Sequence, residues 1–223
     1  MAQREALSQV RISVRNLVEF VMRSGDLDDR RMAGAKKEAM QAGSRLHRKI
    51  QRRMGSDYQA EVSLKHTVKE DSFELLIEGR ADGIITEPGG VTIDEIKCIY
   101  MDPGRLEEPD PVHMAQALCY GTIYAVHHDL EEIGIQLTYC NIETEEIRRF
   151  KEVKTREELE DWFKGLIHEY VKWARYLYHH RMRRQECLKT LQFPYTYREG
   201  QKELAACVYR SVAEGRNLYI QAP

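Results

Sequence analysis

The sequence predicts an α/β protein in which helices flank a central mixed sheet and a long helix follows the sheet. Three observations predict this class. Segments with alternating apolar residues are interleaved with segments whose apolar residues recur at helical spacing. The turn sequence Pro88-Gly89-Gly90 separates two of the alternating segments. A capping box, Thr155-x-x-Glu158, opens the longest helical segment.

The expected elements follow the order helix, three strands, helix, two strands and helix. A short helix is expected over residues 13–22, and a stripe of alanine, leucine and isoleucine predicts a second helix over 31–54. Alternation predicts strands at 62–68, 73–77 and 91–97, and Pro109 and Pro111 introduce a helix that runs to about residue 128. A hairpin at 133–139 and 147–153 leads into the final helix, which extends toward Cys187.

Charge and cysteine usage narrow the class of protein. The 223 residues carry a net charge of −2, so no overall basic field points to nucleic acid. Two segments are locally basic, residues 30–53 and 172–189, and each is either a solvated helix face or a surface that lines a phosphate backbone. The five cysteines form no CxxC pair, and the chain has neither an apolar run of about 18 residues nor a signal-peptide pattern. These features predict a cytoplasmic protein with reduced thiols and no membrane partner.

Two neighbouring strands each carry an acidic residue in apolar surroundings. Asp82 lies in an apolar stretch, where a carboxylate is costly unless it is paired or metal-bound; a turn aspartate before Gly83 is the alternative. Side chains alternate along a strand, so Glu95 and Lys97 share one face and Asp94 points to the other. Two carboxylates with water suit Mg²⁺ or Mn²⁺, and a lysine can activate water or neutralise charge on a phosphodiester.

Two helical motifs flank these strands. The first is Gly43-x-x-x-His47, in which a small residue one turn earlier leaves room in front of the histidine. The second is Gln116-x-x-x-Tyr120, whose spacing places both polar ends on one helix face. Each motif also has an ordinary alternative, a surface histidine in the first and unremarkable helix residues in the second.

In this order, the four motifs resemble the PD-(D/E)XK nuclease superfamily, specifically its RecB/AddB-like branch, which includes the CRISPR-adaptation nucleases. The resemblance covers residues 43–120 and implies a restriction-endonuclease-like core. It implies a metal centre of Mg²⁺ or Mn²⁺ held by three side chains and one backbone carbonyl: His47, Asp82, Glu95 and Ile96.

The resemblance also implies roles for residues around the metal. Lys97 would orient or activate water, and Gln116 and Tyr120 would position the DNA or the lysine. Arg80 is expected either to contact phosphate or to form an ion pair with Glu78 or Glu95, and the basic helix contributes Arg45 and Arg48 to DNA binding. Some relatives hold an iron–sulfur cluster through an early cysteine and a C-terminal cysteine group. This chain has no cysteine before Cys98 and no clustered trio after it, so no such cluster is expected.

The C-terminal segment carries a second resemblance. Residues 197–223 are similar to the entry into the motor of DinG/XPD-type superfamily 2 helicases, where an R-x-x-Q segment precedes a strand ending in Ala-Pro. The sequence ends at Pro223, before any phosphate-loop G-K-[ST]. We therefore expect a nuclease domain over 1–192 and the truncated start of a helicase motor over 193–223, without ATPase activity. An ordinary terminal helix and strand is the alternative.

The two resemblances together predict a metal-dependent DNA exonuclease that acts on single strands or DNA ends in repair or recombination. The helicase domain of the full-length chain would be its partner, and exposed Val208, Leu218 and Ile220 would allow contact with a second copy. Two alternatives stay open. One is a non-cleaving DNA-binding module that feeds DNA to the helicase, and the other is an interaction domain in which the Glu-x-Lys pattern is fortuitous.

Overall fold

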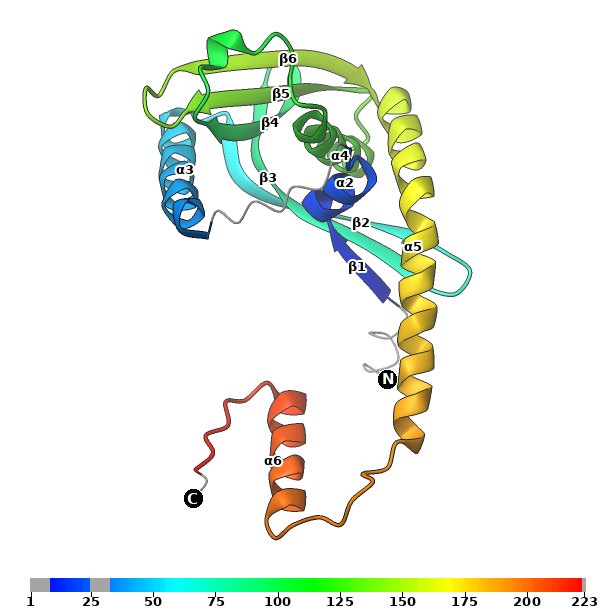
Figure 1. The fold of residues 1–223 in the computed structure, drawn as a ribbon. Helices are drawn as coiled ribbons and strands as arrows, with labels where there is room; N and C mark the ends of the chain where they lie inside the picture. The colour runs from blue at the N-terminus through cyan, green and yellow to red at the C-terminus, as the bar shows by residue number, and fades with distance from the viewer. Residues whose placement is uncertain (1–8, 25–32, 222–223) are drawn as a thin grey trace. The chain divides into compact units, whose positions relative to one another are not determined.

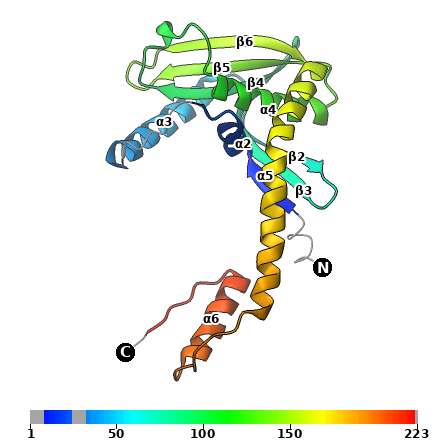
Figure 2. The same ribbon diagram turned by 45° about the vertical axis from the view of Figure 1, so that its right-hand side comes forward.

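The computed structural model of the chain describes residues 9–24 and 33–221. It divides into two compact units, Met1–Arg181 and Met182–Pro223, and the boundary falls within the longest helix. The first unit contains the sheet and its helices, as Figures 1 and 2 show. Its elements in chain order are β1 (Gln9–Ser13), α2 (Val14–Val21), α3 (Ala33–Arg53), β2 (Tyr58–Lys69), β3 (Glu74–Glu87), β4 (Gly90–Ile99), the 3-10 turn η1 (Pro103–Arg105), α4 (Pro111–His127), β5 (Glu132–Asn141), β6 (Ile147–Thr155) and α5 (Arg156–Thr190).

The sheet is mixed. Its main path runs β1-β3-β4-β5-β6, and β2 pairs with β3 along most of its length. The pairs β1–β3 and β4–β5 are parallel, whereas β2–β3, β3–β4 and β5–β6 are antiparallel. The predicted class, a mixed sheet flanked by helices with a long helix after it, is therefore confirmed.

Strand β3 changes partner partway along its length. Residues 74–78 pair with β1, and residues 83–87 pair with β4. The intervening residues, 79–82, pair with neither of these two strands, so β1 and β4 diverge at this point. Asp82 lies at the fork.

Helices cover the two faces of the sheet differently. The large core contains apolar residues of α2, α4 and α5 packed on odd-numbered positions of β4 and β5, such as Ile93 and Leu137. A second, small cluster joins Leu46 and Ile50 of α3 to Ile96 of β4 and Cys140 of β5. Since successive strand residues point to opposite faces, α3 packs on the face opposite to α4. The fork in β3 thus lies where both helices can supply side chains.

Most predicted element positions agree with the structure. The capping box forms, because Thr155 N donates to Glu158 Oε2 over 2.9 Å and Glu158 N donates to Thr155 Oγ1 over 3.2 Å. Ser13 caps α2 by accepting from Asn16 N. The β1 strand was not predicted, and β2 begins at Tyr58 rather than near residue 62. Arg30 and Arg31 of the first basic segment lie outside the described residues.

The second unit contains the end of α5, a loop and helix α6 (Gln201–Glu214). Within the loop, Phe193 stacks on Tyr197 with ring centroids 4.6 Å apart. The expected strand before Ala-Pro is not formed, since residues 216–221 have no regular structure, and residues 222–223 lie outside the described part. An isolated strand has no hydrogen-bonding partner, which explains the difference. Val208, Leu218 and Ile220 are exposed. Among the helices of residues 9–24 and 33–221, none combines the length and apolar character that crossing a membrane requires.

Candidate metal centre and active site

The β3–β4 hairpin brings the predicted acidic residues together. Its register pairs Gly83 with Asp94, and the preceding residue, Asp82, turns its side chain onto the neighbouring strand. Asp82 Oδ2 accepts a 2.8 Å hydrogen bond from the backbone N–H of Ile96, the residue between Glu95 and Lys97. The carboxylate is therefore fixed beside the Glu-x-Lys segment.

Helix α3 supplies His47 to the same place. Leu46 and Ile50 anchor the helix on the sheet, and His47 Nε2 lies 3.1 Å from Asp82 Oδ2. Burial lowers the pKa of His47, but the hydrogen bond and negative charge of Asp82 outweigh burial, so the pKa is raised. Gly43 lies against β4, where a Cβ would meet Cys98 Cβ at 3.6 Å, an ordinary packing distance.

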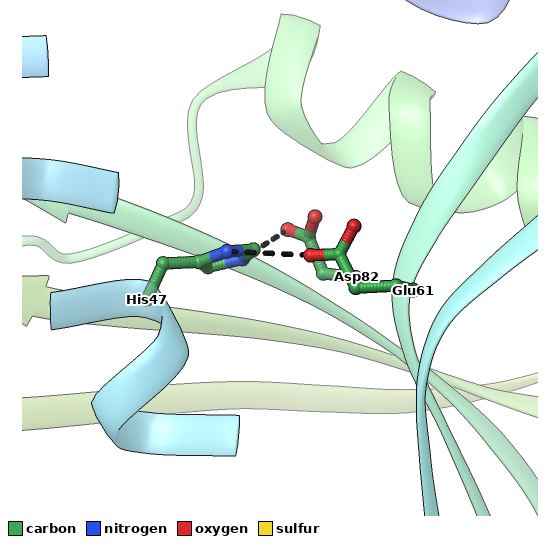
Figure 3. Close-up of side chains that lie close together, drawn as sticks. All are labelled: His47, Glu61 and Asp82. Carbon is green, nitrogen blue, oxygen red and sulfur yellow. Dashed lines mark ion pairs between the residues drawn. The ribbon is translucent and has the colours of Figure 1, made fainter. Parts of the chain in front are cut away.

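Glu61 of β2 is a site residue that the sequence reasoning missed. One oxygen of Glu61, one of Asp82 and one ring nitrogen of His47 lie within 4.8 Å of one another (Figure 3). Glutamates are common on exposed strands, so the residue type gives no signal. The register could have found it, since Ala60 pairs with Gly83 and Val62 with Ala81, which places Glu61 opposite Asp82.

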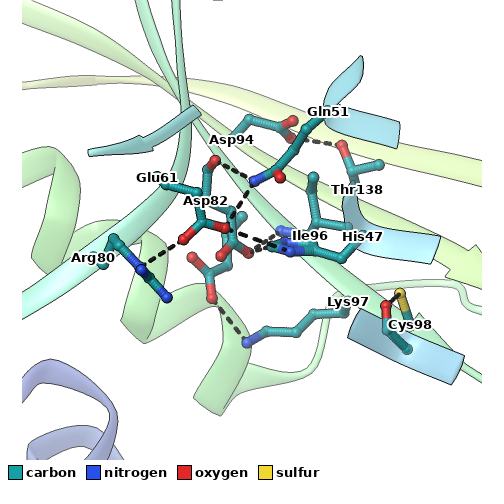
Figure 4. Close-up of polar contacts among 12 residues, drawn as sticks. His47, Gln51, Glu61, Arg80, Asp82, Asp94, Ile96, Lys97, Cys98 and Thr138 are labelled. Carbon is teal, nitrogen blue, oxygen red and sulfur yellow. Dashed lines mark hydrogen bonds and ion pairs between the residues drawn. The ribbon is translucent and has the colours of Figure 1, made fainter. Parts of the chain in front are cut away.

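Gln51, one helical turn after His47, was also missed. Its side-chain amide donates to Glu61 Oε1 over 3.1 Å and to the Asp82 carbonyl over 2.9 Å (Figure 4). Gln51 therefore joins α3 to Glu61 of β2 and to the backbone of Asp82 in β3. Spacing of four residues on α3 places Gln51 and His47 on one face, which is the signal that could have found it.

Glu95 and Lys97 form a buried pair beside this cluster. Lys97 Nζ lies 2.8 Å from Glu95 Oε1, and Glu95 is only 5% exposed. The other carboxylate oxygen, Glu95 Oε2, is buried without a hydrogen-bond partner in the described structure. Burial, followed by the charge of Asp82, raises the pKa of Glu95 to about 7 despite the opposing effect of Lys97. A buried carboxylate oxygen without a donor is costly, and a cation at this position would relieve that cost.

Asp94 belongs to a separate network. It accepts hydrogen bonds from Thr138 Oγ1 (2.6 Å) and Gln136 Nε2 (3.0 Å), and more weakly from the Tyr58 hydroxyl (3.4 Å). Burial raises the pKa of Asp94 although these donors oppose the shift. Strand alternation therefore separates Asp94, which is bonded to β5, from Glu95, which is bonded to Lys97.

Gln116 and Tyr120, the two predicted residues of helix α4, contact different parts of the sheet. Gln116 Oε1 accepts a 2.5 Å hydrogen bond from Lys97 Nζ. Tyr120 instead lies against the backbone of β3: a Cβ on Gly79 would lie 2.7 Å from its hydroxyl oxygen. Burial raises the pKa of Tyr120, so the phenol stays protonated. Gln116 contacts the lysine directly, whereas Tyr120 fills the space beside residues 79 and 80.

The three predicted DNA-binding arginines lie on the surface. Arg80 Nε forms an ion pair with Glu61 Oε2 at 2.6 Å, not with Glu78 or Glu95. Arg45 and Arg48 are exposed on α3, and Arg48 donates to the carbonyl of Ser44 in its own helix. The second basic segment is partly neutralised by acidic partners, in the pairs Lys172–Glu169, Arg175–Glu70 and Lys189–Glu186. The α3 segment is partly neutralised in the same way, because Lys49 and Arg53 both pair with Glu145, whereas Arg45 and Arg48 have no acidic partner among the described residues.

The donor set fits a divalent metal ion of the Mg²⁺ or Mn²⁺ type. His47 offers an imidazole nitrogen, and Glu61 and Asp82 offer carboxylate oxygens, within 4.8 Å of one another. Glu95 offers a further, buried carboxylate oxygen in the segment that Asp82 contacts. Ligand sets rich in oxygen suit both Mg²⁺ and Mn²⁺, and Mn²⁺ also binds imidazole nitrogen. The unpartnered oxygen of Glu95 is the observation in this structure that favours a cation here.

Comparisons with known proteins give likenesses of fold. No protein-family model matches the chain, and neither does any curated protein. An alkaline exonuclease from Laribacter hongkongensis is 13% identical over 84% of this chain and 100% of its own, with a TM-score of 0.46, and 0.48 for its complex with dAMP. The protein SSO0001 is 20% identical over 74% and 80% of the two chains, with a TM-score of 0.45. A phage-related exonuclease from Haemophilus somnus is 16% identical over 77% and 82%, with a TM-score of 0.36. With every identity below 25% and every TM-score below 0.5, these likenesses assign neither a family nor an activity to the chain.

Proposed function

We propose that this chain is a metal-dependent DNA nuclease that hydrolyses phosphodiester bonds as an exonuclease. The observation that carries the proposal is the attachment of the His47–Asp82 pair to the Glu95-Ile96-Lys97 segment, through the bond from Ile96 N to Asp82, with one oxygen of Glu95 buried and unpartnered in the described structure. The sequence resemblance to the PD-(D/E)XK nucleases supports the same assignment. Mg²⁺ or Mn²⁺ would be held by His47, Asp82, Glu95 and the Ile96 carbonyl.

The residues of this chain supply distinct parts of the chemistry. When bound, the cation would supply Lewis-acid polarisation of the phosphodiester and lower the pKa of water. Lys97 has its ammonium fixed by Glu95 and Gln116, where it can orient a water molecule or stabilise charge that develops on the phosphate. Arg45, Arg48 and Arg80 would hold the backbone of the DNA.

We further propose that the nuclease works within a nuclease–helicase fusion in DNA repair or recombination. The C-terminal resemblance to the entry of a DinG/XPD-type motor supports this role. Helix α6 has no buried residue in the described structure. The exposed apolar residues of this unit would equally allow self-association, which analytical ultracentrifugation would detect.

The test is a degradation assay with single-stranded DNA labelled at the 5′ or 3′ end, with and without Mn²⁺. Glu95→Gln and Lys97→Ala should each lower the cleavage rate by about 100- to 1000-fold or more. Asp94→Asn is the matched control, because it changes the neighbouring carboxylate on the opposite face and should retain cleavage. Undiminished cleavage by both active-site variants would refute the proposal. Metal and DNA binding without cleavage by the unmodified chain would favour the DNA-binding module instead.

A further inference from the structure

Glu61 is an acidic residue at the metal centre to which the proposed reaction gives no role. Its backbone has φ of +58°, a conformation that residues other than glycine rarely adopt. The neighbouring residues, Ala60 and Val62, keep their pairing with β3. The local backbone therefore departs from strand geometry at this residue alone, opposite Asp82, and its side chain meets His47 (Figure 3).

The two oxygens of Glu61 have different neighbours. Oε1 lies 3.8 Å from His47 Nδ1 and accepts from Gln51 Nε2, on the side of the proposed metal. Oε2 accepts from Arg80 Nε at 2.6 Å, on the side of the solvent (Figure 4). The Arg80 side chain is 65% exposed and that of Glu61 is 36% exposed. An ion pair this exposed contributes little to stability, so its partners can be exchanged at small cost.

An independent observation points to a cation at the same centre. Glu95 Oε2 is buried and finds no donor in the part of the chain that the structure describes, and the charges of Asp82 and His47 both act on this carboxylate. Glu61 and Asp82 thus lie close to His47, and the charge of His47 also acts on Glu95. Among the described residues, Lys97 pairs with Glu95 and Arg80 pairs with Glu61 on its outer side.

We propose that Glu61 is a further ligand of the divalent cation held by His47 and Asp82, and that the cation replaces Arg80 as the partner of Glu61. The released guanidinium then binds a phosphate of the DNA backbone. This inference rests on the proposed metal-dependent function. Because coupling between two ligands is reciprocal, DNA phosphate that draws Arg80 away from Glu61 also strengthens cation binding. The centre thereby reaches its full ligand set when DNA is present.

Calorimetric titration with Mn²⁺ alone tests the ligand role of Glu61. Glu61→Gln keeps the size of the side chain and should weaken Mn²⁺ binding by about tenfold or more, as loss of a ligand does. Arg80→Ala removes a competing positive charge and should tighten binding by up to about fivefold. Glu78→Gln, an exposed change of the same charge on the same strand as Arg80, is the control and should bind as the unmodified chain does.

Opposite effects of the two substitutions are the decisive result. If Glu61 and Arg80 form only a structural pair, both variants will weaken binding or neither will change it, and the inference fails. Misfolding cannot produce tighter binding, and thermal unfolding without metal checks Glu61→Gln separately. Asp82→Asn distinguishes the two proposals. If the unmodified chain binds Mn²⁺, Asp82→Asn does not, and Glu61→Gln binds normally, only the role of Glu61 is overturned. If the unmodified chain binds no Mn²⁺, the proposed function fails as well.

The transfer of Arg80 from Glu61 to a DNA phosphate is tested by a separate measurement of DNA affinity. In the Lys97→Ala background, which blocks cleavage under the proposed mechanism, Mn²⁺ should raise the affinity for a fluorescent single-stranded oligonucleotide. The same increase should be largely absent when Arg80→Ala is added. An equal Mn²⁺ effect in both backgrounds would show that Arg80 does not transfer to the phosphate.

Discussion

The ammonium group of Lys97 on β4 donates a 2.5 Å hydrogen bond to the side-chain oxygen of Gln116 on α4. Gln116 is only 3% exposed, so this contact is shielded from water. With Glu95 as the second acceptor, two elements fix the direction of one lysine. Gln116 is therefore a positioning residue in the proposed reaction, acting through Lys97.

Gln116→Ala should lower kcat by about 10- to 100-fold, the usual effect of removing a group that orients a catalytic residue. KM should change little, because the glutamine acts on the lysine and not on the DNA. Steady-state kinetics on labelled single strands would separate the two constants. Gln59→Ala, on the exposed face of β2, provides the control. A change confined to KM would instead indicate direct contact between Gln116 and DNA.

Gly83→Ala should destabilise the fold through a collision with Tyr58. A Cβ at this position would lie 2.0 Å from the tyrosine hydroxyl oxygen and ring, so the ring must move out of its packed position. The expected loss is about 1–3 kcal/mol of unfolding free energy, measured by urea denaturation. Gly89→Ala is the matched control, because nothing lies within 4 Å of its Cβ. The double variant Tyr58→Ala/Gly83→Ala should lose less unfolding free energy than the sum of the losses in the two single variants. Strict additivity would contradict the contact.

The sequence predicted those parts of the fold that depend on local periodicity. Strand β4 follows from alternation after the turn at Pro88-Gly89-Gly90, and α5 follows from its capping box, whereas alternation gave only the first part of β3, residues 73–77. Strand β1 could not be predicted in the same way. Its five residues pair in parallel with β3, more than 60 positions later, and nothing in their own sequence encodes that partner.

The same distinction between local pattern and long-range pairing applies to the residues of the candidate site. Motif spacing predicted His47, Asp82, Glu95 and Lys97, and the structure pairs His47 with Asp82 and Lys97 with Glu95. Glu61 depends on the register between β2 and β3, and the contact of Gln51 with the Asp82 carbonyl depends on how α3 lies against β3. Both features are set by pairing between distant segments, which residue type and spacing do not reveal.

His113 should make the unfolding free energy of the protein depend on pH in the mildly acidic range. Burial, followed by the positive charge of Lys97, lowers the pKa of His113 to about 4. The Tyr139 hydroxyl accepts from Asp110 N and lies 3.0 Å from His113 Nδ1, to which it can donate only while that nitrogen is unprotonated. The unfolded chain therefore takes up this proton before the folded chain does. The stability that His113 contributes is complete above pH 6.5 and is lost as the pH falls toward 4.

The difference between the unmodified chain and His113→Asn isolates this contribution from that of other histidines. Between pH 7 and pH 4.5, the unmodified chain should lose about 1–2 kcal/mol more than the variant, a value reduced for the partial exposure of the ring. Urea denaturation across this range is the measurement. Parallel pH profiles for the two proteins would contradict the assignment.

Arg45 and Arg48 should contribute to DNA affinity through phosphate contacts. Replacing either with alanine should weaken binding, and the slope of log K against log salt should become shallower by about 0.7 for single strands. Fluorescence anisotropy at several salt concentrations measures both quantities. Lys164→Ala, an exposed change on α5, should leave the slope unaltered. Unchanged slopes for both arginine variants would remove the α3 face from the DNA-binding surface.

The contact between Gly79 and Tyr120 has a consequence for how the sequence can evolve. The tyrosine hydroxyl occupies the space that a side chain at position 79 would need. A larger residue at 79 can be accepted only after position 120 becomes smaller, and a reversal must follow the opposite order. Among related sequences, these two positions should therefore vary together, and the pair offers a signature for finding distant relatives in which the surrounding residues have diverged.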